Sequence, residues 1–253
     1  MIAARTFAAL LVLHATPWPG FGASVQNQPM GTISLRKRLH INTLITEPGT
    51  VEIDWGSPYS ISSATLQMPL VVKYTPRGRH IIWGRTEYNV AFDSLTRQAV
   101  TFTATSVLID GLHLDIAIAP QATFLIRDDS GARLGATGIA RYDGGHSSVG
   151  VTVGWSAATH SSPTNPAGVF DLGFGFGQNL PGSATLEKFT PHCNVVWERA
   201  TGRSGALSMF EGVEYQMTAR VAFDLSAQHF GVNSGTPDHQ IVLGVTINFG
   251  KLQ

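Results

Sequence analysis

The mature part of the sequence alternates apolar and polar residues with a period of two, segment after segment. In 241–249 every odd position is apolar, with Gly244, Thr246 and Asn248 between Leu243, Val245 and the apolar residues that flank them. Successive side chains of a β-strand point to opposite faces, so this period predicts strands with one apolar and one polar face. Since no segment shows the i, i+3, i+4, i+7 stripe of an amphipathic helix, the fold class is all-β.

Turn signals divide this pattern into twelve expected strands. Asp110-Gly111 and Asp143-Gly144-Gly145 are typical of hairpin turns, because glycine supplies the positive φ that such turns need. The segment near Met209–Glu211 is ambiguous in phase, which leaves a range of roughly 10 to 14 strands. The expected strands are about 50–57, 64–75, 80–93, 98–109, 111–127, 133–142, 147–159, 168–178, 189–199, 205–214, 219–230 and 239–250.

The composition of the polar faces distinguishes two architectures. Charged residues are only 13% of the chain, and the polar faces carry mainly Gly, Ser, Thr, Asn and Gln. A soluble β-sandwich would present many charged residues to water, whereas a membrane barrel has a lipid-facing apolar exterior and a polar interior. A sheet in the hydrocarbon layer must also close, because no backbone group there can bond to water. We therefore predict a closed antiparallel transmembrane β-barrel of about 12 strands, with the soluble sandwich as the alternative.

The N-terminal residues have the pattern of a targeting sequence. One basic residue, Arg5, precedes the apolar run Phe7–Leu13, and Gly22 and Ala23 follow two prolines. This predicts a signal peptide over 1–23, cleaved within 20–24, rather than a frayed N-terminal helix. The segment 24–48 is irregular and is expected to form a lumen plug or strap, and 49–253 is expected to form the barrel. Export together with a membrane barrel implies the outer membrane of a Gram-negative bacterium.

Several short motifs are similar to those of a known family. They are Thr46–Ile53 followed by Pro58-Tyr59, then Glu211–Tyr215, Phe223–Ser226 and Asp238–Phe249. From about residue 46 the chain resembles the meta-pathway phenol-degradation family of outer-membrane proteins. The resemblance implies a channel for small, often aromatic and hydrophobic, compounds and implies no catalytic residues. One departure is that Phe249 is followed by Gly250–Gln253, whereas outer-membrane barrels often end on an aromatic residue that the assembly machinery reads.

The phase of the alternation assigns residues to the two faces. A charge inside a membrane protein is costly unless paired or hydrated, so inward charges indicate a water-filled interior or one crossed by ion pairs. Both an open and a filled lumen fit these residues. The expected lumen-lining residues are Glu52, Asp54, Lys73, Arg85, Glu87, Asp93, Asp115, Gln121, Arg141, Asp171, Arg220 and Asp224. The expected lipid-facing residues are Phe174, Phe176, Phe223, Leu243, Val245 and Phe249.

Other chemistries find little support. Equal numbers of basic and acidic residues, 17 each, leave no surplus charge for nucleic-acid binding. Ser147 and His146 could suggest a nucleophile and its base, but neighbouring residues on a strand point to opposite faces. His192-Cys193 and the His229/His239 pair lack a recognisable metal-ligand spacing.

We therefore expect no enzyme, metal or cofactor. The expected partners are outer-membrane lipids, the assembly machinery and a small solute. The leading hypothesis is a passive channel or uptake protein. The alternatives are a structural barrel without transport and a lipid hydrolase acting at the rim.

Overall fold

The computed structural model describes residues 49–61, 65–77, 80–91, 94–111, 113–125, 131–145, 147–162, 165–180, 182–183, 185–218, 220–233 and 237–251. The expected signal peptide over 1–23 and the irregular segment 24–48 lie outside these residues. No helix in the described part of the chain is long and apolar enough to span a membrane.

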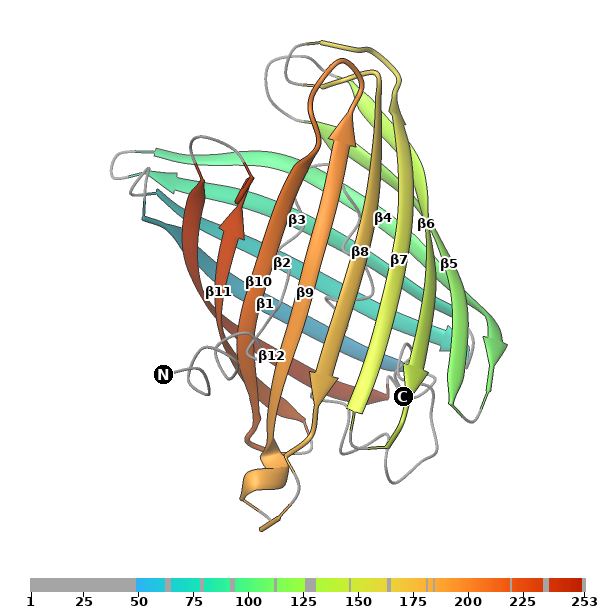
Figure 1. Cartoon of the computed structure of the whole chain (residues 1–253), viewed down its shortest axis with the longest axis vertical. Coiled ribbons are helices and arrows are strands. Elements are labelled where there is room, and N and C mark those ends of the chain that lie inside the picture. The colour runs from blue at the N-terminus through green and yellow to red at the C-terminus, as the bar shows by residue number, and fades with distance from the viewer. Residues whose placement is uncertain are drawn as a thin grey trace.

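The described residues form a closed antiparallel barrel, as Figure 1 shows. Each strand pairs with its neighbours in sequence, and β1 pairs with β12 to close the ring. The strands are β1 (Thr50–Ser60), β2 (Thr65–Arg77), β3 (His80–Ala91), β4 (Ser94–Asp110), β5 (Leu114–Leu125), β6 (Ala132–Asp143), β7 (Ser147–Ala158), β8 (Gly168–Gln178), β9 (Phe189–Ala200), β10 (Ala206–Gln216), β11 (Val221–Phe230) and β12 (Asp238–Lys251). This confirms the all-β fold class and the closed barrel of twelve strands, including the ambiguous segment, which forms β10.

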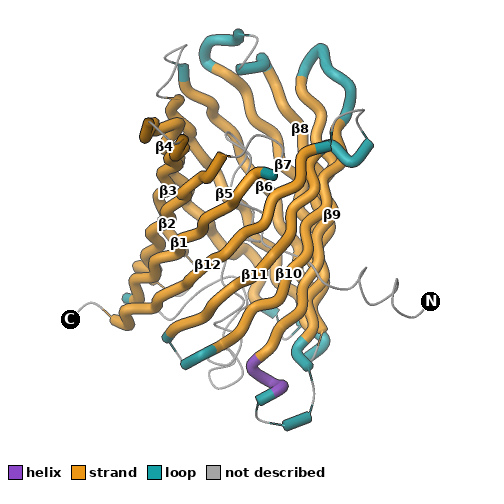
Figure 2. The backbone as a smooth tube through the Cα atoms, turned by 90° about the vertical axis from the view of Figure 1, so that its left-hand side faces the viewer, coloured by secondary structure: helices purple, strands orange, loops and turns teal. Residues whose placement is uncertain are grey.

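The two ends of the barrel differ in their connections. We call the end where β1 begins and β12 ends the terminal rim, and the other end the distal rim (Figure 2). At the terminal rim most strands are joined by tight turns, such as the β6–β7 turn, where Gly145 has φ +87° and donates its backbone N–H to Asp143 Oδ1 at 2.8 Å. The exception is the β8–β9 connection, which carries the short 3₁₀ helix η3 (Leu186–Lys188).

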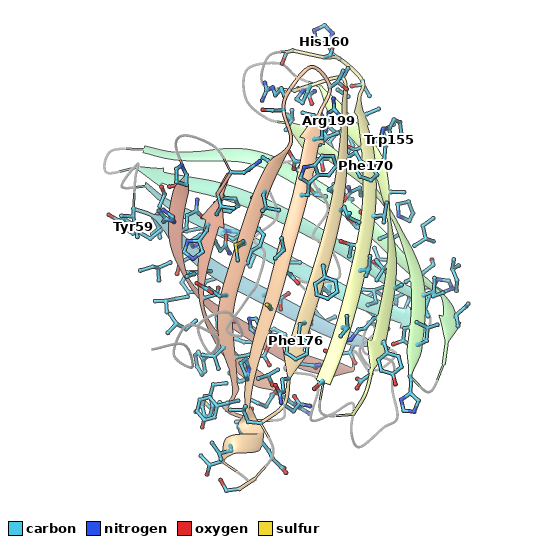
Figure 3. The ribbon with its side chains drawn as sticks, in the orientation of Figure 1. Tyr59, Trp155, His160, Phe170, Phe176 and Arg199 are labelled. Carbon is cyan, nitrogen blue, oxygen red and sulfur yellow. The ribbon has the colours of Figure 1, made fainter. Side chains whose placement is uncertain are left out.

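The exterior of the barrel is apolar. Large hydrophobic side chains point outward from strands all around the ring and stay exposed, among them Phe102 at 55%, Trp155 at 58% and Leu243 at 58%. Figure 3 shows Trp155 and Phe170 near the distal end and Phe176 near the terminal end. A soluble monomer rarely exposes contiguous apolar surface on this scale.

The interior is largely polar. Thr101, Thr103 and Thr105 follow one another along the inward face of β4, and Thr101 shares a 2.9 Å hydroxyl hydrogen bond with Thr123 of β5. An inward apolar patch lies beside this threonine row. Its members, which come from β2 to β6, are Val71, Ile81, Val107, Ala117, Ala119 and Ile139. Hydrophobic residues outside and hydroxyl groups inside are the reverse of a soluble protein's arrangement.

Candidate functional site

The barrel interior is the candidate site, because charged and polar side chains from many strands converge there. On the β1–β2 wall, Lys73 Nζ lies 3.2 Å from Glu52 Oε1 and 2.6 Å from Asp54 Oδ2. Thr246 of β12 donates its hydroxyl to Asp54 Oδ1 at 2.9 Å. Glu52 and Lys73 are direct cross-strand partners, so the register itself brings the opposite charges together.

A second polar group lies on the β9–β11 wall. His192 Nε2 is 3.3 Å from Asp224 Oδ2, and Ser226 donates to Asp224 Oδ1 at 3.0 Å. His192 Nδ1 lies 3.0 Å from the Thr190 carbonyl oxygen, which can only accept, so Nδ1 carries a hydrogen. His192 and Asp224 are therefore placed to form an ion pair when His192 is protonated.

The β7–β8 connection is held over the interior near the distal rim. Arg133 of β6 points inward and is buried, and its Nη1 donates to Asn165 Oδ1 at 2.6 Å and to the Pro166 carbonyl at 2.7 Å. Its Nε and Nη2 donate to Ser156 Oγ at 3.2 and 3.1 Å. Asn165 is only 1% exposed and donates its amide to the His160 carbonyl at 2.8 Å. These contacts fix the loop to the inner wall, while Figure 3 shows His160 at the distal extreme of the molecule.

Two acids lie on the same wall as Arg133. Asp171 of β8 and Glu198 of β9 are direct cross-strand partners. Glu198 interacts electrostatically with Asp171, Arg133 and Arg203. Nearer the terminal rim, Arg141 is the cross-strand partner of Asp115 and also interacts with Asp143. Opposite charges thus lie close together on the described inner wall at several levels.

The structure places the expected lumen residues as follows. Glu52, Lys73, Asp115, Gln121 and Asp171 are buried on the inward face, and Asp54, Arg141 and Asp224 are half-buried there. Asp93 and the side chains of Arg85 and Glu87 lie outside the described residues. Arg220 lies outside the strands, and its place in the lumen stays a prediction. Arg220 is exposed in the β10–β11 turn, because β11 begins at Val221, two residues later than the expected strand.

Of the expected exterior residues, Phe174, Phe223, Leu243 and Phe249 are exposed, and Phe176 and Val245 are half-buried. Sequence reasoning missed the inward residues Arg133, His192, Glu198 and Glu214. Alternation within β9 and β10 could have found the last three, since each shares the phase of polar neighbours such as Asn194 and Ser208.

Across the described ranges, no three His, Cys, Asp or Glu side chains gather as a metal-binding group. His146, the base of the conceivable rim hydrolase, lies outside the described residues, so its geometry with Ser147 is not part of this structure.

Comparison with known proteins gives likeness in fold alone. No protein family matches the chain by sequence, and no curated protein does. Among solved structures, the chain is similar to the NanC porin, with a TM-score of 0.61 and 12% identity over 77% of this chain and 98% of that one. It is also similar to the KdgM porin in complex with disordered oligogalacturonate, with a TM-score of 0.61 and 10% identity over 79% and 99% of the two chains. The barrel therefore has the architecture of outer-membrane porins.

Proposed function

We propose that this chain is an outer-membrane barrel that lets small solutes cross passively. The observation that carries the proposal is the reversed distribution of side chains. Exposed Phe102, Trp155 and Leu243 belong to an apolar exterior suited to lipid, while Thr101 and Lys73 belong to a polar interior suited to water. The porin-like architecture supports this function, and the N-terminal pattern over 1–23 supports export to the outer membrane of a Gram-negative bacterium.

The interior also bears on the class of solute. Acidic side chains outnumber basic ones at the described inward positions, which disfavours a polyanion such as the oligogalacturonate bound by the KdgM porin. The threonine row of β4 offers hydroxyl groups, and the apolar patch around Val71 and Ile139 lies beside it. Small compounds with both a ring and a hydroxyl group fit this pairing. The proposal therefore keeps the aromatic solutes that the resemblance to the meta-pathway phenol-degradation family implies.

The direct test is reconstitution of the purified, folded protein. Heat-modifiable migration on a gel establishes that the barrel is folded, and cell fractionation establishes its location. We expect ion conductance in planar bilayers, and swelling of liposomes in small hydroxylated aromatic compounds faster than in oligogalacturonate. Folded protein with neither conductance nor solute flux would refute the channel.

A structural barrel without transport is the second candidate. The observation that favours it is the set of polar contacts along the inner wall, from the ion pairs of Lys73 with Glu52 and Asp54 to the hydrogen bond between Arg133 and the β7–β8 loop. In a barrel of this size side chains can fill much of the lumen. The same bilayer recording decides between the two candidates. A rim-site lipid hydrolase is the remaining alternative, and release of fatty acid from outer-membrane lipid would be its signature.

A further inference from the structure

A linear cluster of three polar side chains lies on the largely apolar exterior of the barrel. Glu211 of β10, His229 of β11 and His239 of β12 point outward, because their sequence neighbours Phe210, Gln228 and Gln240 are buried on the inward face. His239 lies one residue inside the distal start of β12. Ionisable groups on a lipid-facing surface are costly and rare, so three of them in contact indicate a functional role.

The three side chains contact one another in sequence. His229 and His239 are direct cross-strand partners, and their Nδ1 atoms lie 2.8 Å apart. The other ring nitrogen of His229, Nε2, lies 3.1 Å from Glu211 Oε1. The two rings are 5.0 Å apart between centroids and inclined at 69°, so they meet edge to face rather than stack.

This geometry determines where the ring hydrogens lie when both histidines are neutral. The Glu211 carboxylate can only accept, so His229 carries its hydrogen on Nε2 and keeps a lone pair on Nδ1. His239 must then donate its own Nδ1 hydrogen to that lone pair. If the hydrogen of His239 moves to its Nε2, two Nδ1 lone pairs face each other, with no proton gained or lost by the pair.

We propose that His229 and His239 bind one divalent transition-metal ion through their Nδ1 atoms. Metal–nitrogen bonds of about 2.0–2.1 Å spanning the observed 2.8 Å separation give an angle at the metal of about 84–89°. That angle suits neighbouring positions of a square-planar or octahedral ion, which points to Cu²⁺ or Ni²⁺. Glu211 takes the place of the carboxylate that commonly accepts the far N–H of a metal-bound histidine.

The site has two protein ligands, in keeping with the absence of a three-residue metal group from the described residues. Water or the oxygen atoms of lipid head groups would complete the coordination sphere at this rim. Binding at the exterior does not depend on conduction through the interior. A failure to bind metal would therefore leave the proposed channel function intact, and a lack of conductance would leave the metal site intact.

The test is metal titration of the folded, untagged full chain in detergent. We expect Cu²⁺ to give an electron paramagnetic resonance spectrum with hyperfine coupling to two imidazole nitrogens, and Ni²⁺ to bind by calorimetry with one site that H229A or H239A abolishes. The matched control is H113A, because His113 is also exposed but lies at the terminal rim. Its removal should leave both signals unchanged.

A third variant separates a metal site from a merely structural hydrogen bond. E211Q keeps a hydrogen-bond acceptor for His229 but removes the charge, so metal affinity should fall by about 10–100-fold while the two-nitrogen spectrum remains. Gel migration before and after heating verifies that each variant is folded. If H229A does not fold, H239A replaces it as the test variant, because His239 is exposed. Equal binding by wild type and H239A, or coupling to one nitrogen only, would overturn the proposal.

Discussion

Arg133 Nη1 donates to Asn165 Oδ1 across 2.6 Å, and this contact joins the inner wall of the barrel to the loop that follows β7. Both residues are buried, so the hydrogen bond is shielded from competing water. One side chain of β6 therefore holds the Asn165–Pro166 part of the loop against the inner wall at the distal rim.

Replacing Arg133 by alanine should release this loop. Hydrogen bonds to a charged group contribute about 1.5–3 kcal/mol each, so we expect R133A to lower the free energy of unfolding by about that amount or more. In a conducting barrel it should also raise single-channel conductance. Denaturant titration in lipid vesicles, followed by tryptophan fluorescence, measures the first effect. The matched control is R199A, because Arg199 is exposed at the same end of β9 and should change stability by less than about 0.5 kcal/mol.

Charge on the exterior should destabilise the barrel more than charge on the interior. Leu243 is exposed on the outward face of β12, and L243R should cost about 2–4 kcal/mol in lipid near the membrane centre. At inward Thr246 the same change should cost less, because an arginine there would meet the Asp54 carboxylate. Ser226 is a poorer comparison, since it is buried against Gly212. Equal costs of L243R and T246R in vesicle unfolding would contradict the assignment of faces.

An open lumen should prefer cations weakly. The described inward acids include Glu52, Asp54, Asp115, Asp171, Glu198, Glu214, Asp224 and Asp238, and they outnumber the inward bases Lys73, Arg133 and Arg141. The preference should shrink as salt rises, because the screening length falls from about 10 Å at 0.1 M to about 3 Å at 1 M. Reversal potentials under a salt gradient measure it. D115N and D171N should reduce it further, and anion selectivity would show that the acids are fully engaged by their basic partners.

The strands and their faces could be predicted because alternation is a local property. The run Ile241–Phe249 specifies both a strand and its outward side without reference to any other segment. Arg220 shows the limit, since a residue beside a turn belongs to a strand only if the backbone pairing extends that far. No local pattern marks that point.

The contacts between strands depend on register, which the sequence does not display. His229 and His239 are ten residues apart, a spacing typical of no metal motif, and only the pairing of β11 with β12 places their rings together. Arg133 likewise meets Asn165 through the course of a loop rather than through periodicity. The sequence therefore predicts which side chains face the interior, but it does not predict which of them contact one another.

Glycines beside larger inward side chains of the next strand offer a test of packing between adjacent strands. A Cβ at Gly154 would overlap the Asp171 carboxylate, so G154A should cost about 1–3 kcal/mol, and D171A in the same chain should restore most of it. At Gly212 a Cβ would lie 2.8 Å from the Leu225 carbonyl oxygen as well as 3.0 Å from His192 Nε2. Because backbone cannot be truncated, H192A should fail to rescue G212A. Rescue at both positions, or at neither, would contradict this account.

The fit of the Asp171 side chain into the space left by Gly154 has a consequence for how such a barrel diversifies. Where one strand's missing side chain makes room for its neighbour's, as also at Gly175 beside Asn194, neither column of residues can change alone without a vacancy or an overlap. Inherited change along this part of the wall should then come as co-substitutions between adjacent strands. Side-chain volume would then be redistributed between neighbouring strands of the wall, while the total volume that these pairs fill stays nearly constant.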